Sequence, residues 1–288
     1  MLELIKKVVI PVAGRGTRLL PTSKEQPKEM LPIFYHSPTN QLTLKPMVQC
    51  IFEQLYEIGL REFCFITGSH KQSIEKHFTP DYKELELLES KGTVIAKDLK
   101  QFYEKIEKSS LVYVNQDEPL GYGHAVYLSK SFVGEDKFLL HAGDTMALSK
   151  EDNHLKDCLE SNADGMLMTK YVEDPQNYGV VTGKKMERFL KVESAVEKPK
   201  DPISNLAIMA INTFNNSIFD ALSRVKPGVG NEIQLTDGIQ IMINENKNVL
   251  ASELPKSSLL IDIGTPEKFF DAQKKTYEFF RNENNKTE

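Results

Sequence analysis

Hydrophobic positions follow two different periods along the chain. Residues 7–12 and 63–67 are short apolar runs rich in Val, Ile and Phe, which is typical of buried strands. Residues 47–58 instead carry apolar side chains three or four positions apart, which predicts an amphipathic helix that begins near Pro46 and stops at Gly59. This order of strand, helix and strand predicts a mostly parallel sheet with helices on both faces.

The same organisation extends over the rest of the chain. Residues 33–43 are polar and predict a surface excursion, and Ser69 predicts the cap of a helix that ends near His77. Without an internal repeat or a low-complexity linker, residues 1–288 are expected to form a single domain with halves at about 1–150 and about 151–288. Further strands are expected at 111–115, 138–144, 165–171, 178–182, 186–192, 206–214 and 259–263, and further helices within 81–108 (two, broken near Gly92) and at 218–225, 233–243 and 267–280.

Composition and charge narrow the class of protein. Hydrophobic residues make up 40% of the chain and charged residues 27%, which is ordinary for a globular protein, and the net charge of -5 argues against a nucleic-acid partner. Cys50, Cys64 and Cys158 are widely spaced and are expected to be buried free thiols. No segment is apolar enough to span a membrane, and residues 1–7 lack the apolar region of a signal peptide, so we expect a cytoplasmic protein without a membrane partner.

The first strand leads into a glycine turn crowded with basic residues. Gly14-x-Gly16 lets the backbone approach a ligand closely, and cations beside it indicate an anionic ligand, with phosphate as the first candidate. The P-loop pattern is absent, and the third glycine of the dinucleotide fingerprint is replaced by Leu19. The alternative is a tight turn whose basic side chains are only solvated. These basic residues are Arg15, Arg18, Lys24 and Lys28.

Other polar residues follow later strands at the same edge of the expected sheet. Gln116 and Gly121 come after the strand at 111–115, and Asp144 ends the strand at 138–144. In open α/β sheets, ligands bind at the carboxyl ends of the strands, so these residues are expected near the glycine turn. The alternatives are an ordinary loop residue for Gln116 and a turn residue or helix cap for Asp144.

These segments together resemble a known family. The run from Gly14-x-Gly16-Thr17-Arg18 to the sequence Pro-Lys-Glu-Met-Leu-Pro at 27–32 resembles the signature of sugar-1-phosphate nucleotidyltransferases, and most closely their UTP–glucose-1-phosphate uridylyltransferase branch. The resemblance implies a three-layer α/β/α Rossmann-like nucleotidyltransferase fold with a mixed, mostly parallel central sheet, in which residues 36–43 look like an insertion. Four further segments fit that branch in order, at 121–126, 178–181, 196–208 and 231–237.

The resemblance implies that UTP and glucose 1-phosphate react to form UDP-glucose and pyrophosphate. A phosphate oxygen of the sugar would attack the α-phosphorus of the nucleotide, so catalysis needs positioning and charge neutralisation and no protein nucleophile. Mg²⁺ is the expected cofactor. The first half of the chain would bind the nucleotide, and the second half the sugar phosphate.

The resemblance also assigns roles to individual residues. Arg18 and Lys28 would be the catalytic residues, with Arg18 at the leaving pyrophosphate and Lys28 near the α-phosphate. The alternatives are a surface salt bridge for Arg18 and a solvated pair for Glu197 and Lys198. The remaining expected contacts are Ala13, Gly14, Gly16, Gln116 and Gly121 for the nucleotide, Gly179, Glu197 and Lys198 for the sugar phosphate, and Asp144 and Asp262 for the metal.

Other functions stay open at this point. The sequence Asp-Ile-Gly-Thr-Pro at 262–266 looks more like the thymidylyltransferase branch, so a glucose-1-phosphate thymidylyltransferase, or an enzyme that accepts both UTP and dTTP, is the first alternative. A non-catalytic nucleotide- or sugar-sensing module and a dinucleotide-dependent oxidoreductase are alternatives from other classes. Because the family commonly forms oligomers, we expect a homodimer or homotetramer.

Overall fold

A nine-stranded sheet runs through the centre of the protein and takes strands from both halves of the chain. The computed structural model describes residues 5–37, 39–68, 72–149 and 155–284, so the cap predicted at Ser69 lies outside the described residues. In sheet order the strands are β5 (Ser110–Gln116), β4 (Glu62–Gly68), β1 (Lys7–Pro11), β6 (Phe138–His141), β11 (Leu206–Phe214), β8 (Gly165–Tyr171), β12 (Val249–Glu253), β10 (Leu190–Glu197) and β9 (Gly179–Lys185).

The sheet is mixed. β5, β4, β1 and β6 are parallel, whereas β11 runs antiparallel between β6 and β8. The register between β11 and β8 shifts between Ile208 and Asn212. The buried Asn212 side chain accepts a hydrogen bond from the Met168 amide (3.2 Å) and donates one to the Met209 carbonyl (2.9 Å). A polar side chain is tolerated in this core because it satisfies backbone groups at the irregularity.

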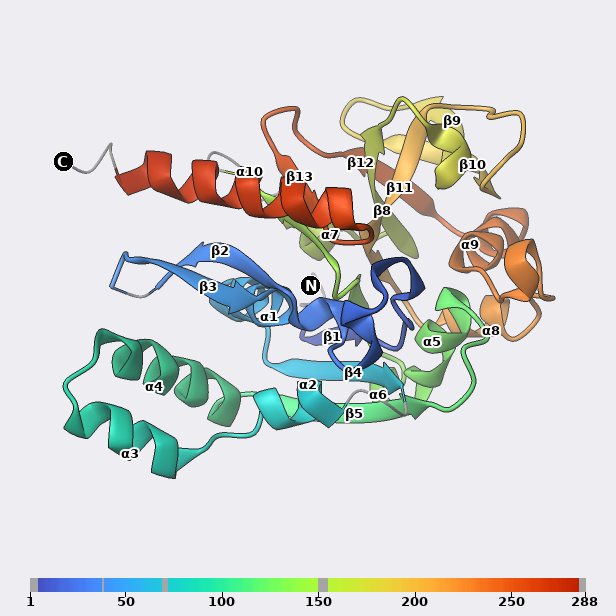
Figure 1. Cartoon of the computed structure of the whole chain (residues 1–288). Helices are drawn as coiled ribbons and strands as arrows, with labels where there is room; N and C mark the ends of the chain where they lie inside the picture. Colours follow the sequence, from blue (N-terminus) through green and yellow to red (C-terminus); the bar gives the residue numbers. More distant parts are fainter. Residues whose placement is uncertain (1–4, 38, 69–71, 150–154, 285–288) are drawn as a thin grey trace.

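Helices cover both faces of the sheet, which gives the three-layer α/β/α arrangement expected from the sequence (Figure 1). One apolar core lies under α1, α3, α4 and α10, and the other lies under α5, α6, α8 and α9. Val8, Val9 and Ile10 of β1 are fully buried, because a central strand covered on both faces needs an unbroken apolar run. The helices are α1 (Met47–Glu57), α2 (Gln72–His77), α3 (Tyr82–Ser90), α4 (Val94–Glu107), α5 (Tyr122–Leu128), α6 (Lys130–Val133), α7 (Lys156–Glu160), α8 (Ser217–Leu222), α9 (Leu235–Asn244) and α10 (Pro266–Asn284).

The surface excursion expected at residues 33–43 is wrong as a description of that segment. Residues 32–46 form a hairpin of β2 (Pro32–His36) and β3 (Leu42–Pro46) that packs against α10. Ring contacts hold it there, with the centroids of Phe34 and Tyr277 5.1 Å apart. Polar residues of this segment, such as His36 and Thr43, therefore belong to paired strands as well as to the connection between them.

The second half also differs from the expected pattern. The strand expected at 186–192 begins later, at Leu190, because the Met186 amide donates to the Phe189 carbonyl (2.8 Å) and closes a turn, and it continues to Glu197. The pattern missed β12 and also β7 (Thr145–Leu148). β7 pairs with β13 (Leu259–Asp262) and brings Asp262 opposite Thr145.

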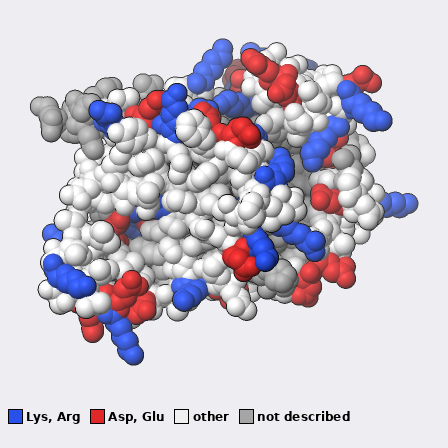
Figure 2. Space-filling view, in the orientation of Figure 1, with Lys and Arg blue, Asp and Glu red and all other residues white. Residues whose placement is uncertain are grey.

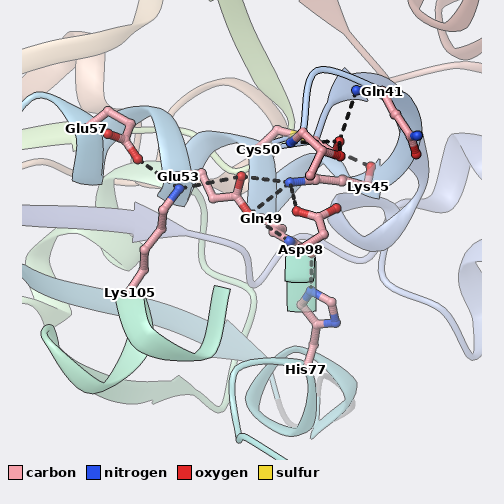
Figure 3. Close-up of polar contacts among 11 residues, drawn as sticks. Gln41, Lys45, Gln49, Cys50, Glu53, Glu57, His77, Asp98 and Lys105 are labelled. Carbon is pink, nitrogen blue, oxygen red and sulfur yellow. Dashed lines mark hydrogen bonds and ion pairs between the residues drawn. The ribbon is translucent and has the colours of Figure 1, made fainter. Parts of the chain in front are cut away.

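A buried group of charged side chains fastens α4 to α1 and β3 (Figure 3). The Lys45 ammonium lies 3.0 Å from a Glu53 carboxylate oxygen and 2.9 Å from one of Asp98. Lys105 joins the group through Glu53, at 4.0 Å, and also pairs with Glu57, at 2.8 Å. The side chains of Lys45 and Glu53 are only 4% and 7% exposed, so their charges depend on one another rather than on water.

Candidate active site

The glycine loop and the expected strand ends enclose a cavity of about 540 Å³. It lies beyond the carboxyl ends of β1, β5 and β6, where an α/β sheet most often binds its ligand. A second cavity of about 450 Å³ shares Ala13, Gly14 and Gln116 with the first and extends to Lys24. Seven of the residues expected to bind substrate or metal line the first cavity, namely Ala13, Gly14, Gly16, Lys28, Gln116, Gly121 and Asp144.

Lys28 and Asp144 form an ion pair at this cavity. Lys28 opens the short 3-10 helix η3 (Lys28–Met30), and Asp144 lies between β6 and β7. Burial by itself would lower the pKa of Lys28, but the neighbouring Asp144 carboxylate raises that pKa above its ordinary value. Burial would likewise raise the pKa of Asp144, and the Lys28 ammonium instead holds it below its ordinary value. Both side chains are therefore charged at neutral pH.

Two neighbours fix the Gln116 side chain through contacts with its amide nitrogen. Its Nε2 donates to the Gly121 carbonyl (3.2 Å) and contacts His124 Nδ1 at 3.0 Å. An amide nitrogen only donates, so Nδ1 must be the unprotonated acceptor in this contact. His124 therefore positions the Gln116 side chain, which is 6% exposed.

Gly121 lies where the family segments at 121–126 and 231–237 meet. Its φ of 109° is a conformation that side-chain-bearing residues rarely adopt, and an added Cβ would lie 2.7 Å from the Ile233 carbonyl oxygen. The Gly123 amide donates to the Ile233 carbonyl, and the Ile233 amide donates to the Leu120 carbonyl, both at 2.8 Å. Residues 231–237, which the sequence indicated as a family motif at the start of a helix, thus form a wall behind the segment at 121–126.

The second expected metal carboxylate, Asp262, is brought beside the first. The Ile263 amide donates to the Asp144 carbonyl (3.3 Å), and Asp262 itself pairs with Lys268 at 2.6 Å. Arg18 lies on the same side, because a Cβ added at Gly264 would be 3.5 Å from its Nη2. Arg18 is exposed and lies outside the lining of the first cavity, so it flanks the site instead of forming its wall.

The two aspartates fit a hard divalent cation. Each carboxylate has an oxygen paired with a lysine ammonium, so each already binds a positively charged group. Among residues 5–37, 39–68, 72–149 and 155–284, no group of three or more His, Cys, Asp or Glu side chains could hold a metal ion. Mg²⁺ suits a two-carboxylate site because substrate phosphates and water usually complete its coordination.

The expected sugar-binding residues form a cluster of their own. Thr236 donates a 2.6 Å hydrogen bond to Glu197, and the other Glu197 oxygen lies 3.1 Å from the Lys198 ammonium. A Cβ added at Gly179 would lie 2.5 Å from Thr236 Oγ1 and 3.0 Å from Glu197, so the backbone must approach this carboxylate without a side chain. Burial and the nearby Glu197 charge raise the pKa of Asp237.

Three side chains at the site were missed by the sequence reasoning. Thr236 was seen only as part of a motif, and Lys268 only as one lysine of a helix. Tyr122 lines the first cavity, and its buried hydroxyl has no hydrogen-bond partner within the described part of the chain. A hydrophobic-polar pattern carries no signal for these three, because it does not show which side chains meet in the folded chain; Thr236, for example, contacts Glu197 from 39 residues away.

The surface carries mixed charges, and the three cysteine thiols are buried. On the face shown in Figure 2, Lys and Arg side chains are interspersed with Asp and Glu. Cys50, Cys64 and Cys158 are buried and free, as expected, and burial raises the pKa of Cys64 to about 12. Within the described residues, no helix has both the length and the apolar character needed to cross a membrane.

Comparisons with known proteins identify the family of this chain. The family model described as nucleotidyl transferase matches residues 7–278. A UTP–glucose-1-phosphate uridylyltransferase of Staphylococcus epidermidis is 38% identical over 259 residues, covering 87% of this chain and 85% of the relative. The structure of a UTP-bound UGPase from Acinetobacter baumannii is 30% identical with a TM-score of 0.80 and covers 94% of this chain and 93% of its own. A UDP-glucose pyrophosphorylase complexed with UDP-glucose is also 30% identical, with a TM-score of 0.78 and coverage of 96% and 99%. The chain therefore belongs to the nucleotidyl transferase family.

Proposed function

We propose that this protein is a UTP–glucose-1-phosphate uridylyltransferase that forms UDP-glucose and pyrophosphate from UTP and glucose 1-phosphate. The observation that carries the proposal is the meeting of Lys28 and Asp144 in a cavity that Gln116 and the glycine loop also line. The Staphylococcus epidermidis relative bears this name, and the Acinetobacter baumannii structure holds UTP, which supports the choice of substrates.

The site suits a direct displacement at phosphorus. An oxygen of the sugar phosphate attacks the α-phosphorus of UTP, a new P–O bond forms, and the bond to the β-phosphate oxygen breaks with release of pyrophosphate. The attacking group is already an anion, so the chain needs no general base. Lys28 stabilises charge at the α-phosphate, and Arg18 stabilises charge on the leaving pyrophosphate. Gln116 recognises the imide edge of the base through its side-chain oxygen, which accepts the imide N–H, because the amide nitrogen already donates to Gly121 and His124.

The sugar phosphate binds on the side of the chain's second half. Glu197 accepts hydrogen bonds from sugar hydroxyls, and its orientation is fixed by Thr236 at 2.6 Å. Lys198 carries its ammonium next to this carboxylate and provides a charge for the phosphate. Gly179 lets the backbone approach the sugar.

Asp144 and Asp262 would hold Mg²⁺. The ion would supply positive charge between the two polyanionic substrates. The expected homodimer or homotetramer is supported by the resemblance alone, and light scattering on the purified chain would test the oligomeric state. The expected cytoplasmic location rests on the sequence pattern and not on the resemblance.

A nucleotide-by-sugar panel tests the proposal. The purified protein is incubated with Mg²⁺, glucose 1-phosphate and either UTP or dTTP, and pyrophosphate release is followed. We expect turnover with UTP at a higher kcat/KM than with dTTP. Faster turnover with dTTP would favour the thymidylyltransferase alternative, since Gln116 can pair with either base. Binding of both substrates without any pyrophosphate release would point to the sensing module instead.

A further inference from the structure

Lys268, at the start of α10, is a charged residue that the mechanism above does not use. Its ammonium lies 2.6 Å from Asp262 Oδ2, and its side chain remains 42% exposed. The other Asp262 oxygen accepts the Gly264 amide at 2.7 Å. The lysine therefore occupies the free oxygen of a carboxylate that the proposed function assigns to the metal.

The pairing repeats what Lys28 does at Asp144. Each of the two metal carboxylates is thus paired with one lysine. An ammonium and a divalent cation compete for the same oxygen, because both are attracted to the same negative charge. When Asp262 binds the metal, Lys268 loses its partner and needs another anion.

The backbone at Lys268 is hydrogen-bonded within the first turn of α10, and its side chain can move without breaking these bonds. The Phe269 amide donates to the Thr265 carbonyl (2.8 Å), and the Lys268 amide donates to Thr265 Oγ1 (3.3 Å). These bonds tie the first turn of α10 in place. A lysine has a flexible four-carbon stem, so a released ammonium can reach a nearby anion without any movement of the helix.

The surroundings of Lys268 indicate which anion this is. Burial would lower the pKa of Lys268, but Asp262 raises it, with Tyr178 adding to the increase and Arg18 opposing it. Tyr178 precedes Gly179, and its carbonyl accepts the Lys198 amide at 3.0 Å. Lys268 thus contacts the metal carboxylate, and its electrostatic neighbours include Tyr178, whose carbonyl is bonded to the sugar-binding residue Lys198.

We propose that Lys268 is a further substrate-binding residue, which exchanges its pairing with Asp262 for the phosphate of glucose 1-phosphate once Asp262 binds the metal. The inference rests on the proposed uridylyltransferase function. It assigns the phosphate of the sugar two lysines from distant parts of the chain, Lys198 and Lys268.

Two measurements on Lys268→Met test this. In the first, Mn²⁺ alone is titrated into the substrate-free protein and free Mn²⁺ is followed by electron paramagnetic resonance. Loss of the competing ammonium should tighten Mn²⁺ binding by roughly threefold to fivefold, the effect of a partly exposed ion pair. In the second, steady-state kinetics should show KM for glucose 1-phosphate raised about tenfold, with KM for UTP within about twofold of wild type.

Lys275→Met is the matched control, because Lys275 pairs with Asp271 at 2.6 Å on the same helix and has a similar exposed fraction, 41%. It should change neither value, and Lys268→Arg should recover part of the KM. Unchanged Mn²⁺ affinity in Lys268→Met, or a raised KM for UTP in place of glucose 1-phosphate, would overturn the inference while wild-type turnover still supported the proposed function. A wild-type protein that released no pyrophosphate would overturn the proposed function, and the phosphate role of Lys268 with it.

Discussion

Lys28 and Asp144 form an ion pair although 116 residues separate them in the sequence. The sheet makes this contact, because β1 and β6 are neighbouring parallel strands whose carboxyl ends lie side by side. Their side chains are 15% and 23% exposed, so the pair is partly shielded from water and open to a ligand in the cavity. In such a pair, Lys28 can release Asp144 and bind a phosphate, and Asp144 can then bind a metal ion.

Removing either charge should therefore reduce catalysis strongly. We expect Lys28→Met and Asp144→Asn each to lower kcat by about 10²- to 10³-fold, the usual loss when one electrostatic contact to a transition state is removed. Pyrophosphate release under saturating substrates measures the effect. Lys7→Met is a matched control, since Lys7 has an ion pair of its own with Asp136 at 2.7 Å and is 18% exposed. If Lys7→Met lost as much activity as Lys28→Met, the loss would reflect stability and not the site.

The elements predicted most accurately are those whose identity depends on local pattern. β8 and β11 begin and end at the residues expected, because strands covered on both faces are long apolar runs. The split of residues 81–108 into α3 and α4 is confirmed, with Gly92 between them at a φ of 64°. By contrast, β12 and β7 are short and acquire their character only by pairing with β8 and β13.

Side-chain partnerships could be predicted only where a family motif named one member. The sequence indicated Glu197 and Asp262 by resemblance, but it could not indicate Thr236 and Lys268, which contact them. Thr236 is 39 residues from Glu197 and comes from a helix, whereas Glu197 ends a strand. Such contacts depend on how α9 and α10 pack on the sheet. Hydrophobic spacing predicts neither the rotation of a helix about its axis nor its position along the sheet.

Thr236 should act through Glu197 on the sugar alone. In Thr236→Val the 2.6 Å hydrogen bond is lost and the carboxylate can rotate away from the sugar. Since a hydrogen bond to a charged group contributes about 1.5–3 kcal/mol, we expect KM for glucose 1-phosphate to rise about tenfold or more while KM for UTP stays unchanged. Thr236→Ser keeps the hydroxyl and should behave as wild type. Equal increases in both KM values would show that Thr236 supports the whole fold instead.

The buried charge group around Lys45 should matter for stability and not for catalysis (Figure 3). Lys45→Met leaves Glu53 and Asp98 without their common partner, and removing one member of a buried ion pair costs about 3–5 kcal/mol of the free energy of unfolding. Urea denaturation would measure this loss. The exposed pair between Lys100 and Glu89 on α4 and α3 is the control, and Lys100→Met should cost at most about 1 kcal/mol. Similar losses in the two variants would mean that water screens the Lys45 group.

His77 should make the stability of this region depend on pH. Burial lowers its pKa from 6.5 to about 4. Its Nε2 lies 2.9 Å from Gln49 Oε1, and the Gln49 side chain also contacts Glu53 (Figure 3). Gln49 Oε1 can only accept, so Nε2 carries the proton of a neutral ring.

Between pH 4 and 6.5 the unfolded chain binds a proton at His77 that the folded chain does not. The free energy of unfolding is therefore highest above pH 6.5, declines as the pH falls from 6.5 towards 4, and receives no further change from this group below that range. The contribution of His77 to this decline is about 2–3 kcal/mol. Urea denaturation of wild type and His77→Gln at pH 7 and pH 4.5 isolates it, because the carboxylates titrate in both proteins. His77→Gln should lose less stability than wild type between the two pH values, and equal losses would mean that His77 titrates alike in the folded and unfolded chains.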